Sequence, residues 1–377
     1  VEIPEGEPII IGSFGVLSGQ ARSLGEDWLR AVELAAAERT EAGGIAGHDV
    51  VIEAQDGECT PQGGSQAALA LVNTPGVVGI IGSACSDETV GGIKSITDAG
   101  LTTISPSATR PSFTDPELRG PEMAGFLRTA HSDYVQGPAV ADFLVERGIT
   151  KVATIHDGSA YAEALAEVFG QNFEEKGGSI TQAEAVTPTD VDMTPVLQSI
   201  AATEPEALDV PIFPGAGAAI VSQVRDIGGM EDVLLVGSDG LYSPDFVTAS
   251  GPDVVGMLLS SPDLGGFEGD YPSFKERYTE FAGHDPLSIF HAHGYDATNM
   301  MMNAIESVAV ENEDGSLSVD LAALREAIYA TADYEGITGT ITCNEAGDCS
   351  VPAIGMYEIT QEDYDEGKAP LTVIWPR

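Results

Sequence analysis

Positively charged residues are scarce in this chain of 377 residues. Its 16 Lys and Arg residues stand against 60 Asp and Glu residues, which gives a formal net charge of −44. A surface this negative repels phosphate groups, so we expect neither a nucleic-acid partner nor attachment to anionic lipid. Self-repulsion on this scale destabilises the compact state unless salt screens it. The composition therefore favours a salty or exposed medium; an acidic composition without functional meaning is the alternative.

Long apolar runs are absent as well. No stretch of about 18 apolar residues occurs in the sequence, so no segment is available as a transmembrane helix. Hydrophobic residues still make up 43% of the chain, which is enough for full cores. Because single cores stop growing near about 250–300 residues, we expect two lobes.

Cysteine occurs only four times, at Cys59, Cys85, Cys343 and Cys349. An even count suits two disulfides, and the sequence alone leaves three pairings open. Pairing Cys343 with Cys349 would close a short loop of turn composition, worth about 2 kcal/mol. A zinc site is the rival interpretation, but the spacing that it needs is missing. Disulfides are therefore favoured, and they imply an oxidising compartment.

Strand and helix signals alternate along the chain. Strands are expected at 8–14, 50–54, 77–82, 102–105, 151–156, 208–213 and 233–237, and short ones after Gly339. Helices are expected at 27–40, 65–72, 88–99, 135–147, 162–176, 191–203, 218–227, 271–282, 293–310 and 321–332. The strand runs lack strict alternation, which suits parallel sheets covered on both faces. The expected fold class is α/β, with two doubly wound (Rossmann-like) lobes.

Catalytic signatures are weak. Residues 237–240 read Gly-Ser-Asp-Gly, one residue short of a nucleophile elbow. His291 and His293 could bind a metal, but no cysteine or carboxylate stands at a matching spacing, so a helix start is the favoured interpretation. We expect no catalytic residue, no metal and no cofactor, and hence no enzyme.

Two polar loops follow strands in the first half, at the sheet edge where α/β proteins bind ligands. The loop 82–89 runs into a helix, with Ser86 as a candidate N-cap. Free N–H groups at that helix end suit a carboxylate, but Ser86 could simply cap its own helix. The loop 105–111 offers the hydroxyls of Ser107 and Thr109 between prolines, and an ordinary turn is its alternative.

A third loop, 237–242, follows a strand of the second half. Its Asp239 could meet an ammonium group on a ligand. An Asx turn without a ligand is the alternative.

A series of different short motifs is spread along nearly the whole chain. They are Gly15-Val16-Leu17-Ser18-Gly19, Gly43-Gly44-Ile45, Asp56 with Cys59, 82–89, 106–111, Arg128-Thr129, Gln136-Gly137-Pro138, His156-Asp157 with Tyr161, 237–241 and Tyr295-Asp296-Ala297. Their order and spacing resemble the substrate-binding proteins of branched-chain amino-acid ABC transporters, which have the type I periplasmic binding protein fold. The resemblance implies a ligand cleft between two lobes joined by a three-segment hinge.

The same resemblance implies the lobe boundaries. The N-terminal lobe would comprise 1–128 and 261–338, and the C-terminal lobe 129–260 and 339–377. The hinge crossings would lie near 125–131, 257–263 and 336–342.

Ligand contacts in the N-terminal lobe also follow from the resemblance. Ser86 and Thr109 would donate to a ligand α-carboxylate. The backbone carbonyl of Ser107, with Ala108 beside it, would help to bind the ammonium. The disulfide Cys59–Cys85 would brace the first loop, which leaves Cys343–Cys349 as the second pair.

In the C-terminal lobe, the resemblance implies that Asp239 pairs with the ammonium and that Tyr161 is a cleft aromatic. Leu24 and Ala216 stand where leucine-type binders carry tyrosines, and Asp239 is one methylene shorter than their glutamate. We therefore expect a ligand other than leucine, with a larger or differently shaped side chain.

The expected function is that of an extracytoplasmic solute receptor. It would bind an amino acid or related small zwitterion by lobe closure and deliver it, as a monomer, to a membrane permease. Its location would be periplasmic or extracellular, free or lipid-anchored, with a leader removed before Val1. The alternatives are a receptor for an aromatic or aliphatic carboxylate without an amine, a ligand-sensing domain, and an enzyme on the same scaffold.

Overall fold

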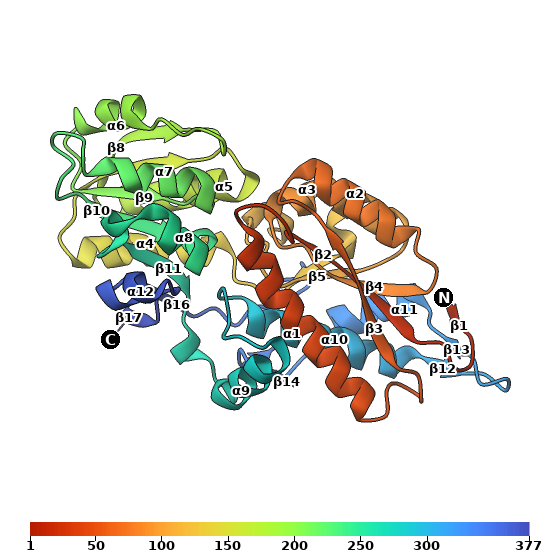
Figure 1. Cartoon of the computed structure of the whole chain (residues 1–377). Helices are drawn as coiled ribbons and strands as arrows, with labels where there is room; N and C mark the ends of the chain where they lie inside the picture. Colours follow the sequence, from red (N-terminus) through yellow and green to blue (C-terminus); the bar gives the residue numbers. More distant parts are fainter. Residues whose placement is uncertain (377) are drawn as a thin grey trace. The chain divides into compact units, whose positions relative to one another are not determined.

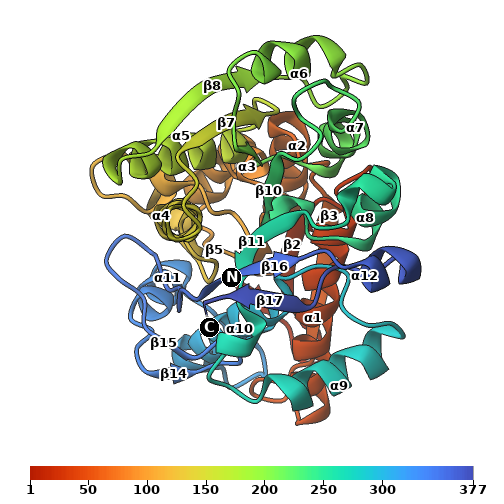
Figure 2. The same cartoon turned by 90° about the vertical axis from the view of Figure 1, so that its left-hand side faces the viewer.

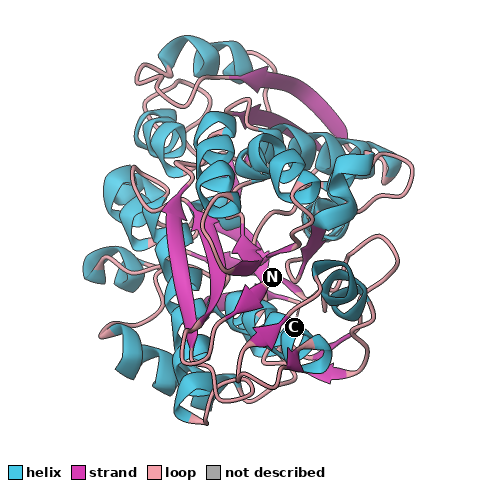
Figure 3. Cartoon of the chain, turned by 90° about the vertical axis from the view of Figure 1, so that its right-hand side faces the viewer, coloured by secondary structure: helices cyan, strands magenta, loops and turns pink. Residues whose placement is uncertain are grey.

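The computed structural model describes residues 1–376 and divides into two compact units (Figure 1). The first unit comprises 1–131, 266–286 and 290–351, and the second comprises 132–265, 287–289 and the described chain from 352 onward. In both units, helices lie on the faces of a mainly parallel sheet (Figure 3). No helix within residues 1–376 is long and apolar enough to cross a membrane.

The unit boundaries differ from the expectation at several places, most of all at residues 339–351; residues 129–131 also lie in the first unit, and 261–265 and 287–289 in the second. Residues 339–351 were expected in the second lobe, but they belong to the first unit. Main-chain hydrogen bonds hold them there, because Arg128 N–H donates to the Gly347 carbonyl and Cys349 N–H donates to the Arg128 carbonyl, both at 3.0 Å. The expected second lobe also included Arg377, which lies outside the described residues.

The sheet of the first unit has the strand order β3-β2-β4-β5-β6, and every neighbouring pair is parallel. Its strands are β2 (Ile9–Gly15), β3 (Val50–Asp56), β4 (Val77–Gly82), β5 (Thr103–Ser105) and β6 (Phe126–Arg128). Its helices are α1 (Arg22–Glu41), α2 (Pro61–Val72), α3 (Ser86–Asp98), α9 (Tyr271–Ala282), α10 (His291–Val308) and α11 (Leu321–Tyr329). The short strands β1 (Glu2–Ile3), β12 (Val310–Glu311), β13 (Leu317–Ser318), β14 (Tyr334–Glu335) and β15 (Thr340–Ile341) form two small sheets.

Consecutive residues of β4 face opposite layers of helices. A Cβ added to Gly79 would meet Met301 of α10 at 2.5 Å. Ile80 instead packs in a core cluster with Leu71 of α2 and Ile96 of α3. A strand buried on both faces needs no polar alternation, which explains the continuous apolar run of β4.

The second unit has a seven-stranded sheet with the order β17-β16-β11-β10-β9-β7-β8 (Figure 2). The parallel strands are β7 (Lys151–His156), β8 (Ser179–Ala185), β9 (Ala207–Val210), β10 (Leu234–Ser238) and β11 (Leu258–Pro262). The strands β16 (Ile354–Glu358) and β17 (Thr372–Trp375) add antiparallel at one edge. Its helices are α4 (Asp133–Glu146), α5 (Ala160–Glu175), α6 (Thr194–Ala201), α7 (Pro214–Val224), α8 (Pro244–Ser250) and α12 (Gln361–Glu366).

The expected strand 208–213 ends early. In the structure β9 stops at Val210, before Pro211, which has no N–H for a sheet ladder. The strands β8, β11 and β6 were not expected. The first two carry polar residues that hide the strand signal, while β6 is only three residues long.

Candidate functional site

The loop after β4 is held by a buried carboxylate. Glu88 Oε2 accepts N–H bonds from Ala84 and Cys85 at 2.9 and 3.0 Å, and its Oε1 accepts from Cys59 N–H at 2.9 Å. The same junction carries the disulfide Cys59–Cys85. Burial raises the pKa of Glu88 to about 7, although the three N–H donors act in the opposite direction. One fully buried side chain thus fixes the backbone that leads into α3.

The sequence suggested Ser86 as the N-cap of α3, but the structure places another residue there. Cys85 is the N-cap and Ser86 is the first helical residue. The reason is Glu88, which stands at the third helical position and accepts the Cys85 N–H. Ser86 Oγ is buried and accepts from Arg110 N–H at 3.4 Å. This contact joins the two polar loops of the first unit.

Ser105, at the end of β5, organises the second loop. Its Oγ donates to the Ser83 carbonyl at 2.7 Å and accepts the N–H groups of Ser107 and Ala108 at 3.3 and 2.9 Å. Ser107 Oγ donates to the Ala84 carbonyl at 2.8 Å. The Ser107 hydroxyl is therefore used within the protein, which is compatible with the expectation that Ser107 acts through its backbone.

Thr109 behaves differently from its neighbours. Its side chain is fully buried, and Oγ1 has no hydrogen-bond partner among residues 1–376. Leaving a buried hydroxyl unsatisfied costs about 1–3 kcal/mol. Such a hydroxyl is able to form a hydrogen bond with a ligand atom.

Helix α1 approaches the first loop through Trp28. Leu24 is buried one turn before Trp28. The Trp28 ring lies 2.5 Å, and the Ala84 Cβ 3.0 Å, from a Cβ built on Gly15. Only glycine leaves room at that position, so Gly15 lets the helix and the first loop approach each other.

In the second unit, the structure brings Asp239 and Tyr161 together. Asp239 follows β10, and its Oδ1 accepts from Tyr161 Oη at 3.2 Å and from Gln136 Nε2 at 2.6 Å. Tyr161 Oη also lies 2.6 Å from Ser238 Oγ and accepts from Gly240 N–H at 3.3 Å. Burial and the Asp239 charge hold the pKa of Tyr161 well above its usual value, so it stays a phenol.

Gln136 is the residue that sequence reasoning missed here. Its Nε2 also donates to the carbonyl and Oγ of Ser260 on β11, at 3.1 and 3.0 Å. Gln136 thus ties Asp239 to the strand beside β10. It did occur in a motif of the resemblance, which was the only signal for it.

The remaining expected residue of this unit is Ala216, which is buried on α7. A Cβ added to its neighbour Gly217 would meet Leu241 at 2.7 Å, so α7 packs on the turn that contains Asp239. Phe213 precedes α7, and its ring lies 5.3 Å from that of Tyr161. The second unit therefore gathers a carboxylate, a phenol and apolar surface at one edge of its sheet.

The two histidines considered as metal ligands serve the core of the first unit. His291 Nδ1 lies 3.0 Å from Asp27 Oδ2, and its Nε2 lies 2.8 Å from Tyr271 Oη. His293 is buried, and burial lowers its pKa to about 3. Among residues 1–376, no group of three or more His, Cys, Asp or Glu is placed to hold a metal ion.

Comparison with known proteins gives concordant matches. A family model described as "Periplasmic binding protein" matches residues 8–353. A Leu/Ile/Val-binding protein homolog of Brucella melitensis is 26% identical over 364 residues, which cover 96% of this chain and 92% of the relative.

Two solved structures of the same architecture differ in what they hold. The substrate binding protein of a branched-chain amino acid transporter from Streptococcus pneumoniae, in complex with isoleucine, matches with a TM-score of 0.82 and 23% identity, over 98% of this chain and 100% of that chain. A solute binding protein of an ABC transporter from R. palustris, in complex with benzoate, matches with a TM-score of 0.78 and 20% identity, over 97% and 96%. They confirm the expected fold class.

Proposed function

This chain belongs to the periplasmic binding protein family, and we propose that it is the substrate-binding protein of an ABC importer for a free amino acid or a related small zwitterion. The names of its relatives support this proposal, since they include Leu/Ile/Val-binding proteins that span nearly the whole chain. The family implies an extracytoplasmic location. We propose that the protein binds and releases its ligand without a chemical step and delivers it, as a monomer, to a membrane permease.

The observation that carries the proposal is the buried, unpartnered hydroxyl of Thr109. We assign Thr109 and Ser86 to the ligand carboxylate, with the backbone of Ser107 and Ala108 alongside. These are neutral donors close to the start of α3, and a helix N-terminus favours an anion. They can bind a carboxylate in a chain whose net charge of −44 would otherwise repel it.

We assign the ammonium of the ligand to Asp239, with Tyr161 as its hydroxyl neighbour and Leu24 and Ala216 near the ligand side chain. This assignment follows the family resemblance and places contacts on both units, as a protein that closes on its ligand requires. Tyr161 remains a neutral phenol and donates a hydrogen bond to Asp239 Oδ1.

A second candidate is a carboxylate that lacks an amine. A specific feature favours it: Asp239 Oδ1 already accepts hydrogen bonds from Gln136 and Tyr161, so its burial does not by itself demand a cation. The benzoate complex of the R. palustris protein indicates that the fold accommodates such a ligand.

Thermal-shift and calorimetric titration with matched ligands separates the two candidates. The panel contains the standard amino acids, benzoate, and the deaminated acid of each amino acid that binds. An amino acid at about 100 times its Kd should stabilise the protein by about 2.7 kcal/mol. A shift with the deaminated acids alone would establish the second candidate, and no shift with any compound would refute both.

The variant Asp239→Asn tests the ammonium assignment. Loss of the charge should weaken amino-acid binding by about 30-fold or more, because truncating one partner of a buried charge pair costs about 2–5 kcal/mol. Asp209→Asn controls for the exchange of a buried side chain, since Asp209 is an equally buried aspartate of the same unit, and burial raises its pKa to about 8. Equal affinity of Asp239→Asn and the native protein would remove the assignment.

A further inference from the structure

We infer that the loop closed by Cys343–Cys349 positions the ligand-binding loop 105–110 through Arg128, so that ligand affinity depends on this disulfide. The part that concerns affinity rests on the proposed function. The part that concerns loop order can be measured without any ligand. Arg128, Asp348 and the disulfide act here as positioning groups and touch no ligand.

Arg128 binds the backbone on both sides of Thr109, the residue with the unpartnered hydroxyl. Its Nη1 donates to the carbonyls of Ala108 at 3.4 Å and Arg110 at 3.0 Å, on either side of Thr109. The guanidinium is almost fully buried. Its planar set of donors is rigid, so moving Arg128 would move both carbonyls and, with them, Thr109.

Asp348 fixes the other side of that guanidinium. Its Oδ2 accepts from Arg128 Nη2 at 2.8 Å and from Nε at 3.2 Å. Burial by itself would raise the pKa of Asp348, but the Arg128 charge overcomes this and holds the pKa below its usual value. Thr114 Oγ1 accepts from Nη2 at 2.5 Å. The acidic partner of this buried cation therefore comes from a segment more than 200 residues later in the chain.

The disulfide brackets this segment. Cys343 and Cys349 are bonded, and Asp348 directly precedes Cys349. The loop also pairs with the backbone of β6, because the Gly347 carbonyl accepts from Arg128 N–H and the Cys349 N–H donates to the Arg128 carbonyl, both at 3.0 Å. These two hydrogen bonds involve Gly347 and Cys349, the residues on either side of Asp348. The disulfide therefore limits how far Asp348 can move.

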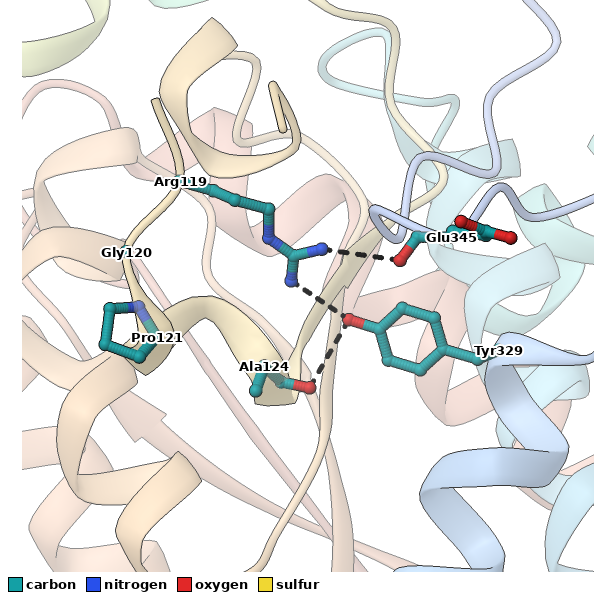
Figure 4. Close-up of a pocket in the computed structure, with 6 residues that line it drawn as sticks. All are labelled: Arg119, Gly120, Pro121, Ala124, Tyr329 and Glu345. Carbon is teal, nitrogen blue, oxygen red and sulfur yellow. Dashed lines mark hydrogen bonds between the residues drawn. The ribbon is translucent and has the colours of Figure 1, made fainter. Parts of the chain in front are cut away.

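The outer face of the loop is held more weakly. Figure 4 shows the Arg119 guanidinium between the Glu345 carbonyl, at 3.5 Å, and Tyr329 Oη, at 3.3 Å. Tyr329 Oη in turn donates to the Ala124 carbonyl at 3.3 Å. It also donates to the Phe126 carbonyl at 3.0 Å. One long contact is all that this side supplies to the loop in Figure 4. At its Asp348 end the loop is held by the disulfide, by the turn that Asn344 makes with Asp348, by Ser350 and by the two main-chain bonds to Arg128.

Amide hydrogen exchange of the ligand-free protein is the first readout. The N–H groups of Ala108 and Arg110 donate to Ser105 Oγ and Ser86 Oγ, so their exchange reports the order of the ligand loop. In the full chain carrying Cys343→Ser and Cys349→Ser, we expect exchange in 105–110 to become about tenfold faster or more, with the α2 and β8 segments unchanged. Unchanged exchange in 105–110, or equal acceleration throughout the first unit, would overturn the inference.

A second variant keeps both disulfides. Asp348→Asn removes the charge that holds Arg128 and should accelerate exchange in the same segment. Asp314→Asn is its control. Asp314 Oδ1 accepts from the N–H and Oγ of Ser316 in the same way as Asp348 Oδ1 accepts from those of Ser350. The difference is that Asp348 also binds an arginine. An effect of equal size in Asp314→Asn would contradict the role of Arg128.

Affinity is the second readout, with L-leucine, L-isoleucine and L-phenylalanine as probes. For each probe that the native protein binds, Kd should rise about tenfold in both loop variants, since one or two hydrogen bonds to the ligand are weakened. An unchanged Kd with faster exchange would refute the effect on affinity. If the native protein bound no probe and nothing in the wider panel, the proposed function would fail, while the exchange result would still decide whether the disulfide orders the loop.

Discussion

Replacing Thr109 by valine should change stability and affinity in opposite directions. Valine has the shape of threonine without the hydroxyl, and Thr109 Oγ1 is fully buried with no hydrogen-bond partner among residues 1–376. Removing an unsatisfied buried hydroxyl recovers about 1–3 kcal/mol of desolvation free energy. The ligand-free variant should therefore be more stable than the native protein by about 1 kcal/mol or more.

Ligand affinity should fall in the same variant. A hydrogen bond to a charged group contributes about 1.5–3 kcal/mol, which corresponds to an increase in Kd of about 10-fold to 150-fold. Urea unfolding followed by circular dichroism measures the first effect, and isothermal titration with the amino acid from the panel measures the second.

Thr103→Val is the matched control for Thr109→Val. Thr103 is equally buried on β5, but its Oγ1 donates to the Gly82 carbonyl at 2.6 Å. The control should lose about 1 kcal/mol of stability, because a satisfied hydrogen bond is removed. The reasoning is refuted if Thr109→Val destabilises the protein as much as Thr103→Val does, or if it binds ligand as tightly as the native protein.

Two further predictions concern charge. Glu88→Gln should flatten the pH dependence of stability. A carboxyl whose pKa is raised to about 7 in the folded protein stabilises the fold fully below its unfolded pKa near 4.5, and this stabilisation is lost as the pH rises through about 7. The difference in unfolding free energy between the native protein and the variant should therefore change by an amount on the order of 3 kcal/mol over this pH range. Urea unfolding at pH 4.5 and 8 tests this, and parallel pH profiles of the two proteins would contradict it. Raising KCl from about 0.1 to about 1 M shortens the Debye length from about 10 to about 3 Å, so the melting temperature of a chain with a net charge of −44 should rise. A melting temperature that stays level or falls with KCl would mean that self-repulsion is not a major cost.

The loops of the candidate site could be proposed from the sequence because, within each sheet, parallel strands end at a common edge. Ser86, Thr109 and Asp239 each follow a run that the structure shows as β4, β5 or β10. The chain direction of parallel strands places the residues after β4 and β5 at one edge of the first sheet, and those after β10 at the corresponding edge of the second. Local composition therefore indicates which loops could bind a ligand.

The internal supports of the site could not be found in this way. Glu88 looked like an ordinary acidic residue in the first turn of a helix, but it accepts an N–H from Cys59, 29 residues earlier. Arg128 depends on Asp348, 220 residues later. β11 was overlooked because Ser260 and Ser261 read as polar, although Ser260 is satisfied by Gln136 across 124 residues.

What the sequence determined on its own were the α/β class, the two doubly wound units and the loops that could bind a ligand, because hydrophobic periodicity and turn composition are local properties. What only the tertiary structure decided was which polar groups in those loops are already used. Ser107 donates to a backbone carbonyl, whereas Thr109, two residues away, donates to nothing among the described residues. That difference depends on partners distant in the chain, and a buried hydroxyl that folding leaves unsatisfied keeps its full hydrogen-bonding capacity for a ligand.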